Sequence, residues 1–407
     1  MKRIEGGVTA VQGFEAASVA AGIKYKDRVD MALVYSTVPA TVAGVFTTNM
    51  VKAAPVKWDM SIIKDCETAQ AMVFNSGIAN ACTGKEGDIV NEAMAKAVAN
   101  ALNLPEKAVL TASTGVIGMP IPVDKVAVGG KLLVENLKSD LEAGHNAAKA
   151  IMTTDTIPKE VAVEFSVAGK TVRLAGMSKG SGMIHPNMAT MLAVVTTDVV
   201  ITKELLQKAL SIDVKDTFNM ISVDRDTSTN DTLIVMANGL ANNAIIDSEN
   251  EDYQAFCEAL HYVNETLAKL MAGDGEGATK LFEAKVIGAK SKEEAVLLSK
   301  SVITSNLVKA AVFGNDANWG RILCALGYAG VEFDPEKVDL FIESESGKLQ
   351  LAKNGLTADF SEEFATKILS DKEVTAICDM HQGEASATAW GCDLTYDYVK
   401  INGDYRS

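Results

Sequence analysis

Five short strings of small polar residues, each broken by glycine, are the part of this sequence best suited to chemistry. They combine hydroxyl, amide and charged side chains with glycines, which permit a positive φ and a close backbone approach. One such string is ordinary turn chemistry, but five with predicted strands between them favour a polar small-molecule site with an oxyanion cradle or a carboxylate pocket. The strings span residues 75–84, 113–118, 178–190, 226–232 and 314–321.

The sequence gives little support to nucleotide, zinc or histidine chemistry. Residues 77–86 have the wrong spacing for a phosphate-binding loop. Residues 273–277 follow a predicted helix and lack the dinucleotide-binding spacing. The four histidines show no metal-ligand spacing, and each alone is more often structural than catalytic. These histidines are His145, His185, His261 and His381.

Residues 179–190, with the apolar run that follows them to Asp198, resemble the ornithine acetyltransferase family, also called the glutamate N-acetyltransferase family. The similarity includes residues 6–10, 39–49 and 152–156 and reaches the C-terminus, so it covers essentially the whole chain. It implies a layered α+β fold of the self-processing, Ntn-hydrolase-like type shared with certain aminopeptidases. It also implies a second, smaller C-terminal lobe.

The resemblance further implies that the chain cuts itself between Ala189 and Thr190. The products would be an α chain, residues 1–189, and a β chain, residues 190–407, packed as one folded unit, with two copies of each in the assembly. Taken alone, Thr190 is as well explained as a threonine at the start of a strand. Only the surrounding family string favours a nucleophile at this position.

A new amino terminus would explain how acyl transfer proceeds without histidine. A threonine hydroxyl is a weak nucleophile until a base removes its proton. After cleavage, Thr190 would carry a free α-amine, which titrates near ~7.7–8.0 when unperturbed and can serve as that base. Before cleavage, the same hydroxyl can attack the carbonyl carbon of Ala189, and water can open the ester that forms.

The resemblance implies a ping-pong transfer of acetyl from N-acetylornithine to glutamate through acetyl-Thr190, in arginine biosynthesis. It implies that the Thr114 side chain and the Gly115 N–H hold the oxyanion, whereas the sequence alone makes them a turn. No metal or cofactor is implied, and some relatives also accept acetyl-CoA as a substrate. The implied substrate-binding residues are Thr153, Lys179, Thr190, Glu276, Asn402 and Ser407.

The chemistry of these residues suits amino-acid substrates. Lys179 would supply positive charge and lower the pKa of the Thr190 amine, while Glu276 would hold an ammonium group. Asn402 and Ser407 would bind a carboxylate, which makes the extreme C-terminus part of the site although chain ends usually fray. The neighbouring Thr154 is an alternative to Thr153.

Two features fall outside this assignment. Arg225 stands where the family resemblance leads us to expect glycine, and an arginine would be strained there if the backbone needs a positive φ. Asn315, Asp316 and Arg321 could support the pocket or a subunit contact, and a purely structural role explains them equally well.

Strands and helices alternate without a regular βαβ rhythm, which favours a layered α+β or α/β fold over a doubly wound nucleotide-binding fold. Apolar patterning predicts a helix over residues 91–102 with Asp88 as its cap, and a hairpin turn at Ala168, Gly169 and Lys170. Further helices are predicted at 203–210 and 253–271. Strands are predicted at 31–35, 71–74, 161–167, 171–175, 191–195, 233–236, 338–342 and 385–400.

Composition excludes several protein classes. At about 150 residues per domain, 407 residues allow two or three packed lobes. Hydrophobic residues make up 48% and charged residues 22%, which excludes wholesale disorder. The net charge is 38 − 53 = −15 without a basic stripe, so we expect no nucleic-acid partner. No apolar run approaches the roughly 18 residues of a membrane span.

The six cysteines are scattered and form no C-x-x-C pair, which favours reduced thiols. The N-terminus lacks the apolar segment of a signal peptide, so we expect a cytoplasmic protein that does not bind membranes. Two other functions stay open on the sequence alone. One is an amidohydrolase or aminopeptidase that releases the acyl group from Thr190 to water, and the other is a non-enzymatic amino-acid-binding protein.

Overall fold

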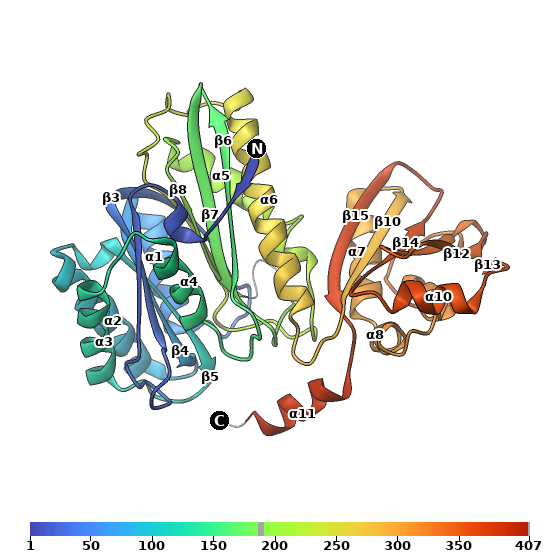
Figure 1. Ribbon diagram of the computed structural model, residues 1–407, viewed down its shortest axis with the longest axis horizontal. Coiled ribbons are helices and arrows are strands. Elements are labelled where there is room, and N and C mark those ends of the chain that lie inside the picture. The colour runs from blue at the N-terminus through green and yellow to red at the C-terminus, as the bar shows by residue number, and fades with distance from the viewer. Residues whose placement is uncertain (186–190, 406–407) are drawn as a thin grey trace.

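The computed structural model describes residues 1–185 and 191–405, which form two lobes (Figure 1). Within these residues, the larger lobe contains a nine-stranded sheet in the order β1-β6-β7-β8-β9-β3-β4-β5, with β2 also paired to β3. Its strands are β1 (Lys2–Ile4), β2 (Phe14–Val19), β3 (Met31–Phe46), β4 (Thr68–Ile78), β5 (Val109–Val116), β6 (Lys159–Val167), β7 (Lys170–Lys179), β8 (Leu192–Thr197) and β9 (Thr232–Ala237).

The smaller lobe is C-terminal and holds a six-stranded sheet in the order β13-β12-β11-β14-β10-β15. Its strands are β10 (Leu281–Ala289), β11 (Asp339–Ser344), β12 (Gly347–Lys353), β13 (Leu356–Thr357), β14 (Glu373–Asp379) and β15 (Ala385–Cys392). The two sheets and their helices confirm the layered α+β class and the smaller C-terminal lobe.

Helices cover both sheets and connect the lobes (Figure 1). In the larger lobe they are α1 (Ala54–Asp65), α2 (Gly84–Leu102), α3 (Val123–Glu135), α4 (Leu141–Ala150), α5 (Lys203–Asp213) and α6 (Glu251–Gly273). The remaining helices are α7 (Lys292–Thr304), α8 (Asn306–Phe313), α9 (Trp319–Gly327), α10 (Glu362–Leu369) and α11 (Tyr396–Asp404). Among the described residues no single helix is both long and apolar enough to cross a membrane, although the bent pair α7 and α8 passes that test when taken together.

The central strands of the larger sheet are buried from end to end. All residues of β8 and β9 are buried, which requires both faces of these strands to be covered. α5 and α6 pack on one face, and the other face packs in one cluster with apolar residues of β3, β4 and β5. The cluster around α6 continues into β10 and α7, so the two lobes share one continuous hydrophobic core.

Local sequence explains where several elements begin and turn. The Asn250 side chain accepts a hydrogen bond from the Tyr253 N–H and so caps α6, whose first turn is acidic. Ala168 and Gly169 have φ values of +48° and +74°, which suits a two-residue hairpin between β6 and β7. The hairpin prediction is therefore confirmed, with Lys170 already the first residue of β7.

Two of the predicted elements are wrong. Asp88 lies inside α2, which begins at Gly84 after Thr83, because the first turn of this helix is polar and carries no apolar stripe to read. The strand predicted at 385–400 ends at Cys392, and α11 follows as a helix that buries none of its residues. A helix without a buried face shows no helical periodicity in its sequence.

The fold of the larger lobe brings the ends of distant strands together. β7 ends at Lys179 and pairs antiparallel with β8, so that Lys179 lies opposite Leu192. β4 and β5 run parallel to each other and carry Ser76 opposite Thr114 near their carboxyl ends. The C-terminal end of α6 leads into the loop that holds Glu276. These segments surround the candidate site.

Candidate functional site

A pocket of about 130 Å³ lies where these strand and helix ends meet. It is lined by every described residue that the resemblance assigned to catalysis or substrate binding. These residues are Thr114, Gly115, Thr153, Lys179, Glu276 and Asn402. They come from β5, the loop before β6, the end of β7, the loop after α6, and α11. The pocket therefore joins residues from opposite ends of the chain. The predictions for Ala189, Thr190 and Ser407 concern residues outside those that the structure describes.

Backbone shape at the end of β5 requires glycine. Gly115 has a φ of +129°, and a Cβ at this position would collide with the carbonyl group of Gly77 on β4. The strand pairing is irregular at the same place. Only glycine therefore allows this backbone to pass so close to its neighbour while Thr114 faces the pocket.

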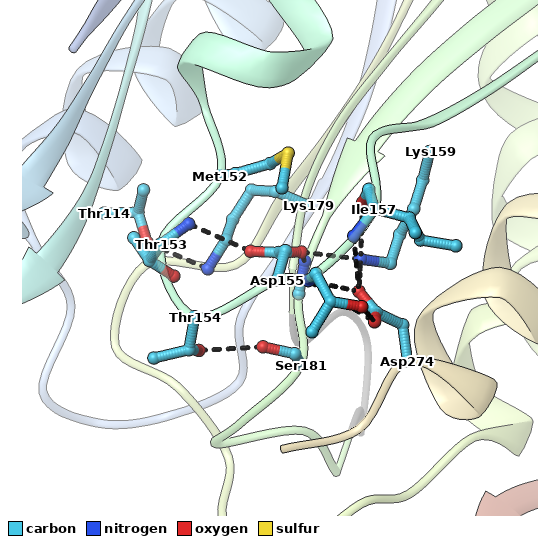
Figure 2. A network of polar contacts seen from close by, with 12 residues as sticks. Thr114, Met152, Thr153, Thr154, Asp155, Ile157, Lys159, Lys179, Ser181 and Asp274 are labelled. Atoms are coloured by element: carbon cyan, nitrogen blue, oxygen red, sulfur yellow. Dashed lines mark hydrogen bonds and ion pairs between the residues drawn. The ribbon is translucent and has the colours of Figure 1, made fainter. Parts of the chain in front are cut away.

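Lys179 contacts the candidate oxyanion residue directly. Its Nζ lies 3.2 Å from Thr114 Oγ1, and both residues are buried (Figure 2). Burial lowers the pKa of Lys179, the nearby Asp155 carboxylate opposes this shift, and Lys159 adds to it. Because an ammonium group can only donate, Thr114 Oγ1 is the acceptor and keeps its own O–H for another group.

Glu276 is held in place by α11 and by the backbone. Asn402 Nδ2 donates to Glu276 Oε2 at 2.7 Å, and the Glu276 N–H donates to the Ser181 carbonyl at 2.8 Å. A Cβ at Gly182 would overlap the Glu276 carboxylate, so the glycine string beginning at residue 178 permits this close approach. The C-terminal helix thus contributes to the pocket through Asn402.

Both members of the ambiguous threonine pair line the pocket. The Thr153 N–H donates to Asp155 Oδ2 at 3.0 Å, whereas the Thr154 hydroxyl lies 2.8 Å from the hydroxyl of Ser181 (Figure 2). The Thr154 hydroxyl is therefore already engaged within the protein. This difference leaves Thr153 better placed to offer its side chain to a ligand.

A buried ion cluster behind the pocket was missed by the sequence reasoning. Lys159 Nζ lies 2.7 Å from Asp155 Oδ1 and 2.6 Å from Asp274 Oδ2, so it pairs with both carboxylates (Figure 2). Burial alone would raise the pKa of Asp155, but the charges of Lys179 and Lys159 hold it well below its usual range. Asp155 and Lys159 are four residues apart outside any helix, and Asp274 is distant in sequence, so no sequence pattern indicated the cluster.

A second buried carboxyl group lies close to the start of β8. Asp231, Lys179, Thr114 and Met191 line a small inner cavity of about 30 Å³. Burial raises the pKa of Asp231 well above its ordinary value, against hydrogen bonds from hydroxyl groups and the charge of Lys179. The Met191 carbonyl accepts a hydrogen bond from the Thr232 N–H at 2.8 Å. The chain that follows Thr190 is thereby fixed beside the pocket.

Arg225 has the positive φ that we considered when arginine was found where the family resemblance leads us to expect glycine. Its φ is +71°, in the left-handed region that favours glycine. The preceding residue, Asp224, accepts hydrogen bonds from the Met183 and Ile184 N–H groups. The strained turn therefore adjoins a contact that shapes the glycine string of residues 178–185, although Arg225 itself is exposed.

Other candidates lie away from the pocket. Asn315 accepts a hydrogen bond from Lys280, and Asp316 accepts one from Asn318. Arg321 donates a hydrogen bond to the Leu307 carbonyl. These contacts are structural ones within the C-terminal lobe. Among the described residues no group of three or more His, Cys, Asp and Glu side chains could hold a metal ion.

Comparison with known proteins agrees with this arrangement. The family model described as the ArgJ family matches residues 15–407. This chain belongs to the ArgJ family. It is 54% identical to the arginine biosynthesis bifunctional protein ArgJ 1 of Clostridium acetobutylicum, over 98% of this chain and 97% of that protein. It is 52% identical to the corresponding ArgJ protein of Caldanaerobacter subterraneus, over the full length of both.

A solved structure belongs to the same family. The crystal structure of the argJ protein from Bacillus halodurans is 47% identical and matches with a TM-score of 0.50. The match covers 52% of this chain and 98% of that solved chain. The resemblance on which the sequence analysis relied is thus confirmed, together with the class of fold.

Proposed function

We propose that this chain carries an acetyl group on the hydroxyl of Thr190 while moving it from N-acetylornithine to glutamate. Membership of the ArgJ family makes the chain an acetyltransferase of arginine biosynthesis. The observation that carries the proposed route is the convergence of Thr114, Thr153, Lys179 and Glu276 on one pocket beside the start of β8. Thr190 is two residues before that strand.

The first half-reaction forms an ester and releases an amine. The Thr190 hydroxyl adds to the acetyl carbonyl of N-acetylornithine, and the α-amine of Thr190 takes up the hydroxyl proton. The tetrahedral oxyanion accepts hydrogen bonds from the Thr114 hydroxyl and the Gly115 N–H. Since Lys179 donates to Thr114 Oγ1, it polarises the Thr114 O–H bond toward the oxyanion. Collapse breaks the C–N bond, and the same proton leaves on ornithine.

The second half-reaction reverses these roles. The α-amine of glutamate adds to the acetyl ester, the oxyanion forms in the same place, and the C–O bond to Thr190 breaks. The amine proton passes to the Thr190 oxygen through its α-amine. Because both half-reactions place a free or acetylated amine at the same point, one pocket can serve both substrates.

Charges in the pocket suit amino acids. Glu276 is a buried carboxylate that can hold an ammonium group, and Lys179 supplies a compensating positive charge. Asn402 Nδ2 donates to both Glu276 Oε2 and the Tyr398 carbonyl. We therefore assign Asn402 the orientation of Glu276 rather than the carboxylate binding suggested by the resemblance. Ser407 remains the proposed partner of the substrate carboxylate, and Thr153 remains a proposed substrate-binding residue.

We propose self-cleavage between Ala189 and Thr190 as the source of the α-amine. β7 precedes the cut and β8 follows it, and the two strands pair along Leu174–Lys179, so the pieces would stay joined. The match to the solved argJ chain covers about half of this chain but 98% of the other, as expected for a β chain of 407 − 189 = 218 residues. We propose two copies of each piece.

Two further expectations accompany this function. We propose acetyl-CoA as a second acetyl donor, which the word bifunctional in the names of relatives supports. We also propose that the protein works in the cytoplasm, since all six cysteines are free thiols. Acetylation of glutamate by labelled acetyl-CoA in the absence of N-acetylornithine tests the first, and localisation of a tagged chain tests the second.

Intact-mass measurement tests the route. Wild-type protein should give two polypeptides, and Thr190→Ala should give one. With N-acetylornithine alone, the β chain should gain the mass of one acetyl group, and added glutamate should remove it. Release of free acetate at the same rate with and without glutamate would instead favour a hydrolase. An active enzyme that consists of one unbroken chain would refute the proposal.

A further inference from the structure

The ion cluster of Asp155, Lys159 and Asp274 lies behind the pocket wall. The side chains of Asp155 and Lys159 are completely buried, and that of Asp274 is 6% exposed. Taking three charged groups out of water is costly, and apolar residues of similar volume often stabilise a protein at least as well. Stability alone therefore gives a poor explanation for the cluster at this place.

The cluster ties together three of the chain segments that line the pocket. Asp155 Oδ2 accepts from the Thr153 N–H at 3.0 Å, and Asp155 Oδ1 accepts from the Gly180 N–H at 2.7 Å, next to Lys179. Asp274 directly follows α6 and is two residues before Glu276. Lys159 bridges these two carboxylates (Figure 2), so its single ammonium group fixes all three segments relative to one another.

Asp274 holds the same region by more than its ion pair. Its carboxylate accepts from the Thr156 N–H at 3.0 Å and from the Thr156 hydroxyl. The loop that carries Thr153 is therefore attached to the end of α6 as well as to Asp155. A displacement of Lys159 would therefore move the loop that carries Thr153 and the loop that carries Glu276 at the same time.

The cluster also controls the charge around Lys179. Burial lowers the pKa of Lys179, Asp155 raises it, and Lys159 lowers it. Glu276 and Asp231 are the other carboxyl groups that act on Lys179, and both raise its pKa. The negative charge of Asp155 thus acts on two lysines, since Lys159 contacts it directly and Lys179 lies nearby. The ion pair with Lys159 partly neutralises this charge and so weakens its effect on Lys179.

We propose that Lys159 is a positioning residue for acetyl transfer, which fixes the Thr153, Lys179 and Glu276 segments through Asp155 and Asp274. The inference rests on the proposed function, because it gives Lys179 a part in the reaction. Lys159 acts entirely through other residues and does not touch the pocket.

The test uses the mature enzyme and the pH profile of kcat/KM for acetyl transfer. Lys159→Met should lower the rate by up to about 10²-fold, as expected for misplaced binding groups. It should also move the basic limb of the profile, which we assign to loss of the Lys179 proton, to higher pH. The pKa of Lys179 should rise because a positive neighbour is removed and the charge of Asp155 is no longer neutralised by Lys159. Asp155→Asn should move the same limb to lower pH, and Lys159→Arg should restore the wild-type limb.

A matched control separates these shifts from loss of a buried lysine. Lys280 is also buried, and it donates to the Val312 and Leu369 carbonyls in the C-terminal lobe. Lys280→Met should lower the thermal unfolding temperature without moving the basic limb. If Lys159→Met does not fold, Asp155→Asn decides alone, and an unmoved limb in that variant overturns the inference.

The outcomes also distinguish this inference from the proposed function. If wild-type protein is neither cut at Thr190 nor acetylated by N-acetylornithine, the proposed function fails. If the wild type passes both tests but the limbs of Lys159→Met and Asp155→Asn coincide or move in the same direction, only the positioning role of Lys159 fails. Opposite shifts with rescue by arginine support it.

Discussion

Removing the amide of Asn402 should weaken substrate binding without disturbing the fold. Asn402 Nδ2 lies 2.7 Å from Glu276 Oε2, and it is the contact through which α11 orients this buried carboxylate. α11 itself buries none of its residues. Asn402→Ala therefore changes the surroundings of Glu276, while the hydrophobic core that sets the unfolding temperature is left intact.

The size of the effect follows from the charge on Glu276. A hydrogen bond to a charged group contributes about 1.5–3 kcal/mol. Asn402 is exposed, so water can partly replace its amide, and the lower end of this range applies. Since about 1.4 kcal/mol corresponds to a factor of ten, we expect kcat/KM to fall about tenfold. The loss should appear mainly in KM, because the proposed contact of Glu276 with an ammonium group is the same before and during the reaction.

Steady-state kinetics with N-acetylornithine and with glutamate measure this change. Val399→Ala provides the control, since Val399 lies on the same helix and is 69% exposed. Asn402→Asp should raise KM further than alanine does, because it brings a second carboxylate against Glu276. An unchanged KM in Asn402→Ala, or an equal loss in Val399→Ala, would refute the assignment of α11 to the site.

Three other outcomes are expected. Thr114→Val should lower kcat by about 10²–10³-fold at unchanged cleavage and KM, since it removes one of the two proposed oxyanion donors, and Thr114→Ser should keep most of the rate. Hydrogen bonds to Asp213 and Glu265 raise the pKa of His261 to about 10, so the stability from this histidine is fully present below pH ~6.5 and is lost as the pH rises through 10. The urea midpoint of wild type should fall over that window, and that of His261→Gln should fall less. Arg225→Gly should leave the free energy of unfolding, measured with urea, unchanged or raise it by at most about 1 kcal/mol, because relief of the left-handed backbone competes with a more flexible unfolded chain.

Local patterns predicted the parts of the fold that local forces decide. The turn at Ala168 and Gly169 was visible because a two-residue hairpin needs a specific backbone conformation. The buried strand β8 was visible because its apolar run is continuous. α11 was mistaken for a strand because it buries no face, and its place is set by long-range contacts such as Asn402 with Glu276.

The candidate site divides in the same way. Thr114, Lys179 and Glu276 could be named because the chain resembles a family, and the structure brings them to one pocket. Asp274 lies in the same glycine-rich stretch as Glu276, but its pairing with Lys159 could not be predicted, since 115 residues separate the two. Charge pairing inside a core depends on which segments the fold brings together, and a single sequence does not contain that information in local form.

The position of the proposed cut explains how one chain can gain a catalytic amine without losing its fold. The bond between Ala189 and Thr190 lies in the connection from β7 to β8, two strands held together by direct backbone pairing. β8 is also paired with β9 on its other side, and all of its residues are buried. The interactions that hold β8 therefore do not pass through the connection. A new amino terminus formed there would be two residues before a fixed strand, and the next residue, Met191, lines the same small cavity as Lys179 and Thr114. Cleavage at the proposed bond would therefore create a base close to these two residues.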